Sequence, residues 1–266
     1  MTSVAGRFPE PPDRNPDFDE DFSAPALLPN RWVDHYLPHW TEPERSIAQY
    51  DLDAAGLRLR IDADQPDWRA EDAPLRVSNL QTGTFSGPLG STQGTHRHRP
   101  DGLVVRTETP LQLFWAPSEG RVELTVSASK DPGSMLAGWL IGTEHLSAQD
   151  SGEICIFEID AEAVATEETR VRSGIKAHSD PRLQTDMITS TLPIDASEPH
   201  TWAVQWSAGC TLIGCDGILL RRLEQAPSYP LFLMIDLFEI GGRTADPEAY
   251  PKTARIHRVR GWNSGH

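Results

Sequence analysis

The sequence predicts an all-β protein built as a two-sheet antiparallel β-sandwich, a jelly roll. Short runs of apolar and β-branched residues recur between clusters of Gly, Pro, Asp and Ser, which is the pattern of strands and turns. No long stretch has the 3.6-residue apolar period of a helix, and only residues 160–170 (DAEAVATEETR) resemble a short one. A length of 266 residues fits a single sandwich domain.

Thirteen segments have this strand pattern, and so many short strands indicate a sandwich or barrel rather than an α/β fold. Residues 122–127 alternate apolar and polar side chains, as in an antiparallel strand with one buried face. Residues 231–240 are apolar on both faces except for Asp236 and Glu239, so we expect a central strand there. The segments are 57–62, 103–108, 111–116, 121–129, 134–142, 153–160, 170–178, 186–194, 200–207, 210–215, 218–223, 231–240 and 254–262.

The two ends of the chain differ in composition. Residues 1–22 are rich in Pro and Asp and are predicted to be an extended lead-in, with a disordered tail as the alternative. Residues 23–266 are predicted to be one sandwich domain. The first thirty residues lack the apolar stretch of a secretory signal peptide, so we expect a cytoplasmic protein.

Charge and cysteine content exclude several classes of partner. A formal net charge of −15 opposes binding to nucleic acid, whose recognition needs basic patches, but it does not oppose a neutral sugar polymer. No apolar run is long enough to span a membrane. Cys155, Cys210 and Cys215 are an odd number without zinc-ligand spacing, so we expect reduced thiols. The sequence carries no signal for an oligomeric state.

The acidic segment 151–162 (SGEICIFEIDAE) has a break in its strand pattern. Its apolar residues lie first at Ile154 and Ile156 and then at Ile159 and Ala161, so the buried parity changes between the two pairs. A β-bulge near Phe157 restores one buried face, and bulges are common beside active sites. The bulge would place one set of side chains on the opposite face: Glu153, Cys155, Glu158, Asp160 and Glu162.

Clustered carboxylates on one strand face have two interpretations. They can be a solvated outer face, or they can be the paired acids of a retaining glycosidase. That reaction needs two carboxylates about 5 Å apart, one to attack the anomeric carbon and one to protonate the leaving oxygen. A further aspartate between them would hold the nucleophile in place and tune both pKa values.

The string GEICIFE resembles the bulged signature of glycoside hydrolase family 16, Glu-Ile-Asp-Ile-x-Glu. Members are laminarinase- and β-glucanase-like enzymes with a concanavalin A-like jelly roll. Other segments resemble the family in the same order, and together they cover roughly residues 18–262. They are GRVELTVSAS, MLAGWLIG, HTWAVQWS, the Asp216-Gly217 hairpin, YPLFLMIDLFEIGG and ARIHRVRGW.

The resemblance implies roles for the acidic residues. Glu153 takes the nucleophile position and Glu158 the general acid/base position, and the substrate would be a β-linked glucan- or galactan-like polysaccharide or oligosaccharide. Cys155 stands where the family has its assisting Asp, and a neutral thiol cannot supply that charge. Hydrolysis can therefore be lost, which leaves two alternatives: a non-catalytic carbohydrate-binding (lectin-like) module, or a jelly roll that serves only as a structural scaffold.

A second alignment frame is open. Residues 158–162 match the family's unbulged signature, Glu-Ile-Asp-x-Glu, and would make Asp160 the assisting acid. We favour the first frame because Gly152 precedes it, as in the family, and because it starts 14 residues after Trp139, a plausible loop length. Asp160 remains a catalytic candidate, and Glu162 a candidate for substrate binding.

Several residues outside the acidic strand are candidate substrate contacts. The resemblance places Trp139 in the sugar cleft as a stacking platform, with a core tryptophan as the alternative. His178 can contact substrate or be structural, and the loop 96–99 can clamp an anionic sugar or be a solvated turn. Residues 32–40 can line one end of the cleft, although Pro38 argues against a helical metal site. No cofactor is expected; the resemblance allows a structural calcium ion, with no ligands assigned.

Overall fold

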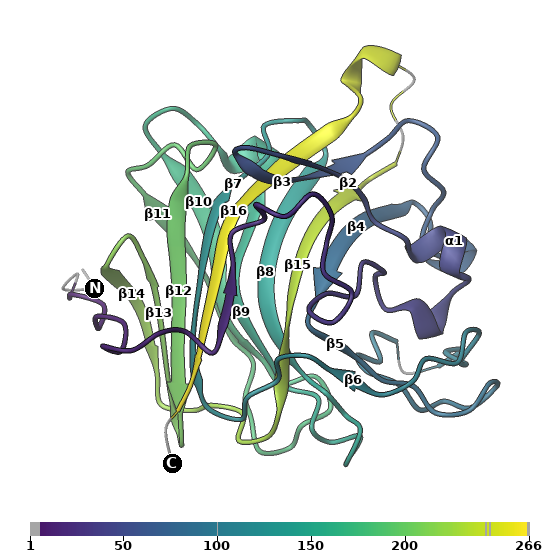
Figure 1. Ribbon diagram of the computed structural model, residues 1–266, viewed down its shortest axis with the longest axis horizontal. Helices are drawn as coiled ribbons and strands as arrows, with labels where there is room; N and C mark the ends of the chain where they lie inside the picture. The colour runs from purple at the N-terminus through teal and green to yellow at the C-terminus, as the bar shows by residue number, and fades with distance from the viewer. Residues whose placement is uncertain (1–5, 100, 243, 245, 265–266) are drawn as a thin grey trace.

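A computed structural model describes residues 6–99, 101–242, 244 and 246–264 and confirms the antiparallel β-sandwich (Figure 1). One sheet has the order β14 (Ile218–Leu223), β13 (Cys210–Cys215), β12 (His200–Ser207), β7 (Gly120–Ser127), β16 (Lys252–Asn263), β3 (Gly56–Ile61) and β2 (Gln49–Asp53). β1 (Phe18–Glu20) also pairs with β16. We call this the first sheet.

The second sheet carries the acidic strand. Its order is β11 (Asp186–Leu192), β10 (Thr169–Lys176), β9 (Glu153–Asp160), β8 (Ser134–Gly142), β15 (Leu231–Ile240) and β4 (Leu75–Gln81). A small pair, β5 (Gly83–Thr84) and β6 (Gln112–Leu113), lies apart from both sheets. The helical elements are short: α1 (Pro43–Ser46), η1 (Pro38–Trp40), η2 (Ala70–Asp72), η3 (Ala161–Ala163) and η4 (Pro247–Ala249).

The core lies between the two sheets, where strands contribute alternate residues. β15 gives Leu231, Leu233, Ile235 and Leu237 to this cluster, which also contains Trp202 and Trp206 of β12. As expected, β15 is an interior strand, buried on both faces. The other side of β15 points away from the first sheet. We call this side of the second sheet the concave face.

Loops cover part of the concave face with a second apolar cluster. Trp139, Met234 and Phe238 of the sheet pack there beside Trp40 and Trp68 of the loops. Both loop tryptophans are almost completely buried, so this part of the face is dry. Figure 1 shows α1 and the adjoining loops on this side of the molecule.

Some expected strands are absent and others were missed. Residues 103–108 form no strand although Leu103 and Val105 are buried in the second cluster, because alternating burial does not require a ladder partner. Of segment 111–116 only β6 is extended, and of residues 160–170, whose sequence resembles a short helix, only η3 is helical. Among the described residues, four strands lie outside the thirteen predicted segments: β1, β2, β4 and β5. Among the described residues, no helix is long and apolar enough to cross a membrane.

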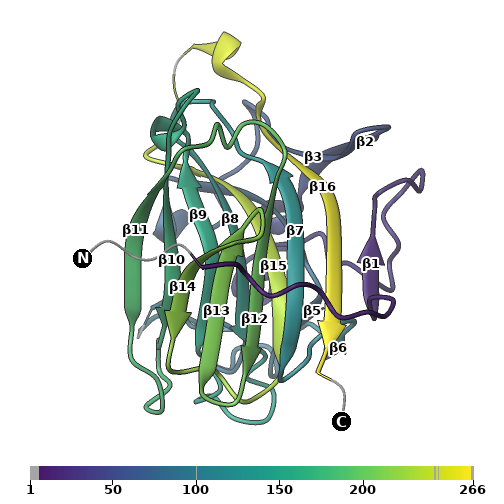
Figure 2. The same ribbon diagram turned by 90° about the vertical axis from the view of Figure 1, so that its left-hand side faces the viewer.

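The described part of the N-terminal segment lies on the first sheet. Arg7 pairs with Ile218 of β14, and the Phe8 amide donates to Gly217 O at 2.8 Å. The segment then crosses the outer face of this sheet to reach β1 beside β16 (Figure 2). Phe18 and Phe22 join the core cluster, so the lead-in is extended and packed over these residues.

Candidate active site

The predicted bulge is confirmed in β9. Gly138 of β8 pairs with Phe157 and its neighbour Trp139 pairs with Cys155, which leaves Ile156 without a partner on β8. Ile156 and Phe157 both lie in the core, as the change of parity requires. Gly138 makes room for this arrangement, because a Cβ there would come within 2.7 Å of the Phe157 ring.

The bulge brings three acidic-strand side chains together on the concave face. Carboxylate oxygens of Glu153 and Glu158 and the sulfur of Cys155 all lie within 4.8 Å of one another. This spacing agrees with the carboxylate separation of about 5 Å that a retaining glycosidase needs. Glu153 is 1% exposed, whereas Glu158 is partly open to solvent.

Two cations on β10 form ion pairs with these acids. Lys176 Nζ lies 3.0 Å from Glu153 Oε1 and 2.6 Å from Glu158 Oε1. Arg172 Nε donates to Glu158 Oε2 at 2.9 Å, and its guanidinium also pairs with Asp160. Burial alone would raise the pKa of Glu158, but Lys176 and Arg172 outweigh it and hold that pKa below its usual range.

Cys155 lies between the two glutamates as a neutral thiol. Burial, reinforced by the charges of Glu158 and Glu153, raises the pKa of Cys155 well above its usual value. Its sulfur donates a weak hydrogen bond of 3.8 Å to Arg172 O. The position therefore supplies no negative charge between the acids.

A cavity of about 220 Å³ opens beside these groups on the concave face. Trp139 faces it, and the Trp139 indole is fixed by its Nε1, which donates to Asp236. Asp236 is completely buried and also accepts from Asn79 Nδ2 at 2.7 Å. Burial raises the pKa of Asp236 to about 8 against these two hydrogen bonds. The remaining lining residues are Leu75, His96, Met135, Ala137, Glu153, Glu158, Lys176, His178, Phe238 and Ile240.

Two histidines close one side of the cavity. His178 follows β10, and its Nε2 lies 2.8 Å from Glu153 Oε2. The His96 ring comes from the loop between β5 and β6 and packs edge-on against His178, with centroids 5.0 Å apart, and against Trp139. Burial lowers the pKa of His96 well below its usual value. Both residues have positive φ, 56° and 48° for His96 and His178, which is uncommon for non-glycine residues and recurs at functional sites.

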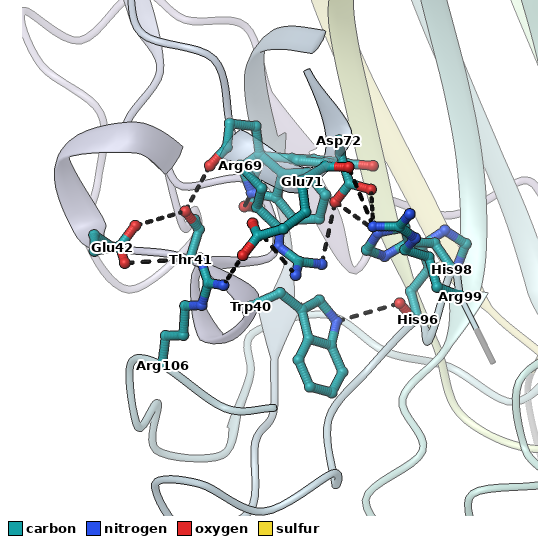
Figure 3. Close-up of polar contacts among 12 residues, drawn as sticks. Trp40, Thr41, Glu42, Arg69, Glu71, Asp72, His96, His98, Arg99 and Arg106 are labelled. Carbon is teal, nitrogen blue, oxygen red and sulfur yellow. Dashed lines mark hydrogen bonds and ion pairs between the residues drawn. The ribbon is translucent and has the colours of Figure 1, made fainter. Parts of the chain in front are cut away.

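A network of ion pairs holds the loop that carries His96 (Figure 3). Asp72 contacts Arg69, His98 and Arg99 within 3.1 Å. The backbone oxygen of His96 accepts from Trp40 Nε1 at 3.2 Å. A second cavity of about 280 Å³ continues past His96 and His178 toward Arg97, Glu144 and Ser151. Burial raises the pKa of Glu144 to about 8, opposed by a hydrogen bond from the His96 amide.

The remaining sequence candidates lie outside the cavity lining. Asp160 keeps the concave face but pairs with Arg172. The prediction that Glu162 shares that face is wrong, because β9 ends at Asp160 and Glu162 lies in η3, where its Oε1 accepts from Gly133 N at 2.6 Å.

Three side-chain clusters among the described residues have the spacing to hold a metal ion. They are His96, Glu153 and His178; Glu153, Cys155 and Glu158; and His200, Cys215 and Asp216. Each contains a histidine or a cysteine, ligands that suit zinc-like ions rather than calcium, which takes oxygen ligands. The calcium ion allowed by the family resemblance therefore finds no fitting cluster among these three.

The chain was compared with known proteins by sequence and by structure. The sequence matches no protein-family model and no curated protein. Among solved structures, a GlcNAcα1-4Gal releasing endo-β-galactosidase from Clostridium perfringens is similar with a TM-score of 0.79 at 23% identity, over 96% of this chain and 65% of that one. This chain thus spans just under two thirds of the length of that enzyme.

Two further solved structures are similar to this chain over nearly its whole length. A non-specific endo-β-1,3(4)-glucanase from family GH16 has a TM-score of 0.65 at 17% identity, covering 97% of this chain and 94% of its own. The laminarinase catalytic domain from Thermotoga maritima has 0.63 at 15% identity, covering 95% and 99%. The chain has a family 16 glycoside hydrolase fold. At these identities the family 16 likeness establishes the fold, and the chemistry has to be argued from the site.

Proposed function

We propose that this protein is a retaining glycoside hydrolase that acts on a β-linked, glucan- or galactan-like polysaccharide. The observation that carries this proposal is the pair Glu153 and Glu158, whose carboxylate oxygens lie within 4.8 Å of each other beside Trp139 in an open cavity. Similar solved structures include laminarinases, a β-1,3(4)-glucanase and an endo-β-galactosidase, which supports a β-linked chain as substrate.

The proposed reaction has two steps. Glu158 donates a proton to the glycosidic oxygen while Glu153 attacks the anomeric carbon, which gives a covalent glycosyl-enzyme and releases the leaving sugar. Glu158 then takes a proton from water as the water oxygen displaces Glu153, and both carboxyls return to their starting states. Trp139 lines the cavity and would be the aromatic contact for a pyranose ring, and Asp236 fixes its indole.

Binding without hydrolysis is a second candidate, favoured by the charges around Glu158. A general acid should hold a proton near its working pH, but Lys176 and Arg172 lower the pKa of Glu158. Cys155 adds no compensating negative charge. Both features favour the ionised form of Glu158, which suits a sugar-binding cleft better than an acid catalyst.

Release of reducing ends from a panel of β-linked glucans and galactans distinguishes the two candidates. We expect the wild type to cleave at least one polymer and Glu153→Gln to lose the activity by a factor of about 10³ or more, as removal of a nucleophile does. Glu158→Gln should lose most activity on natural polymers. The isosteric Gln variants keep the packing, so wild-type affinity for oligosaccharide in the calorimeter is their control.

Cys155→Asp tests the position that departs from the family signature. A carboxylate there raises the pKa of Glu158 by like-charge repulsion and should increase or create hydrolysis of β-1,3- or β-1,4-glucans. If neither the wild type nor Cys155→Asp cleaves any polymer, and both bind oligosaccharide, the hydrolase proposal fails and the binding module remains.

A further inference from the structure

We propose that His96, Glu153 and His178 form a binding site for a divalent transition-metal ion of the zinc class, and that this ion and a sugar exclude each other from the cavity. Two imidazoles and one carboxylate, with a fourth position left open, are a ligand set that zinc uses in proteins. The three residues come from three different elements: the loop between β5 and β6, strand β9, and the turn after β10.

The spacing of the ligand atoms requires only small movements. The three atoms lie within 4.8 Å of one another, and His178 Nε2 is 2.8 Å from Glu153 Oε2. Tetrahedral zinc with bonds of about 2.0–2.1 Å places neighbouring ligand atoms roughly 3.3 Å apart. An ion inserted between the two atoms would therefore separate them by about half an ångström, which side-chain rotation can provide.

The backbone and the surrounding contacts hold the two histidines in place, and their rings can still bind an ion. Each has a positive φ that fixes its backbone in an uncommon conformation, and the ion pairs of Figure 3 anchor the loop that carries His96. Within the described part of the chain, the His96 ring makes stacking contacts but no hydrogen bond. An imidazole whose ring nitrogens make no hydrogen bond within the described residues can supply one of them to a metal ion.

The local charge accepts a cation. Glu153 and Glu158 contribute two negative charges and Lys176 one positive charge, while Arg172 is shared between Glu158 and Asp160. Lys176 contacts Glu153 through Oε1, which leaves Oε2, the atom nearest His178, for the ion. Lys176 should weaken metal binding without preventing it.

The cluster of His200, Cys215 and Asp216 serves as an internal comparison. This cluster has one imidazole where the cavity site has two, and the His200 Nε2 lies 3.1 Å from Asp195 O, which is not a member of the cluster. Burial raises the pKa of Cys215 far above its usual value, so an ion would have to displace the thiol proton in order to bind there. Similar spacing therefore predicts metal binding at the cavity and not at this cluster.

Titration of the metal-free protein with Zn²⁺ in a calorimeter tests the site. We expect one ion per chain, with affinity at least tenfold lower in His96→Ala and in His178→Ala and unchanged in the matched control His200→Ala. Thermal melts show whether each variant is folded. Absence of a one-to-one site, or loss of binding in His200→Ala but not in the cavity variants, would overturn the proposal.

Lys176→Met should change the Zn²⁺ affinity in the opposite direction. Removing the cation that competes for Glu153 should strengthen Zn²⁺ binding at least threefold, an effect that a general loss of structure cannot produce. Weaker binding in a folded Lys176→Met would count against Glu153 as the ligand.

The exclusion of sugar rests on the proposed function and is measured separately. Zn²⁺ should inhibit hydrolysis at concentrations matching its calorimetric affinity, and a chelator should restore the rate. Zn²⁺ that binds without inhibiting an active enzyme disproves the exclusion. If the protein hydrolyses nothing, the same question is answered by oligosaccharide titration with and without Zn²⁺, so failure of the hydrolase proposal leaves the metal site tested on its own.

Discussion

The concave face of the second sheet has two halves that shift the pKa values of buried carboxyl groups in opposite directions. On β15 and β8, beneath the tryptophan-rich loops, Asp236 is buried among apolar groups with only neutral donors, and its pKa rises to about 8. On β9 and β10, Glu158 faces the cavity beside Lys176 and Arg172, and its pKa falls. The same sheet face thus supplies a dry half that supports the fold and an ionic half that can do chemistry.

The difference follows from which partners each half provides. Burial without a cation favours the neutral acid, whereas two cations within hydrogen-bond distance favour the ionised one. Trp139 lies at the boundary, with its ring facing the cavity and its Nε1 bonded to Asp236 in the dry half. The proposed platform for a sugar is therefore fixed by Asp236, which is completely buried.

Trp40→Ala should have the largest effect on stability. Trp40 is completely buried in the dry half, and its Nε1 donates to Thr95 O at 3.0 Å. Truncating a buried tryptophan costs about 3–5 kcal/mol, and urea unfolding would measure it. His178→Ala in the ionic half, where the side chain is 25% exposed, should cost less than about 1 kcal/mol. Equal losses would remove the distinction between the halves.

Asp236→Asn should change how stability depends on pH. The pKa of Asp236 in the folded protein, about 8, lies above its ordinary value of 3.8. Asp236 therefore contributes its full stabilisation of the folded state below about pH 4, and this contribution is lost as the pH rises toward 8. Asn has no proton to lose, so its stability relative to the wild type should increase by roughly 2–4 kcal/mol between pH 5 and 8. Parallel curves from urea unfolding at both pH values would contradict the assignment.

Lys176→Met should move the pH profile of hydrolysis. Lys176 lowers the pKa of Glu158, so its removal raises that pKa and keeps the acid protonated to higher pH. We expect the alkaline limb of the kcat profile to move to higher pH, so that the rate on that limb exceeds that of the wild type. Lys130→Met, which removes an exposed lysine paired with Asp195, is the matched control. An unmoved profile would show that Lys176 does not set the charge of Glu158.

Glu162→Ala should have the smallest effect. Its carboxylate accepts one bond from Gly133 N outside the cavity, so hydrolysis should stay within a factor of two and stability should fall by about 1 kcal/mol. Loss of hydrolysis comparable to that of Glu158→Gln would instead support the frame 158–162 as the catalytic signature.

Much of the fold was predictable from the sequence because it depends on short-range patterns. The change of apolar parity between Ile156 and Ile159 located the bulge, and the bulge alone accounts for the shared face of Glu153 and Glu158. The same reasoning failed two residues beyond Asp160, at Glu162. Side chains alternate between the two faces only while the strand continues, and β9 ends at Asp160. β4 was missed because its buried residues include Ser78, Asn79 and Gln81, whose polar side chains hide its strand pattern.

The cations and histidines of the site could not be predicted in the same way. Lys176 lies opposite Glu153 only in the observed register of β9 and β10, which the bulge shifts. His96 reaches Glu153 and His178 from a loop whose path is set by ion pairs with η2 and by Trp40.

The sequence by itself determined the sandwich, the bulged acidic strand and the pair Glu153 and Glu158, because alternation along a strand is local. Only the tertiary structure decided that Lys176 and Arg172 form ion pairs with these acids, that Asp236 supports Trp139, and that His96 and His178 meet at Glu153. Those contacts depend on strand register and loop packing. Residues far apart in the chain fix both, so no local pattern encodes the charges that surround the acids.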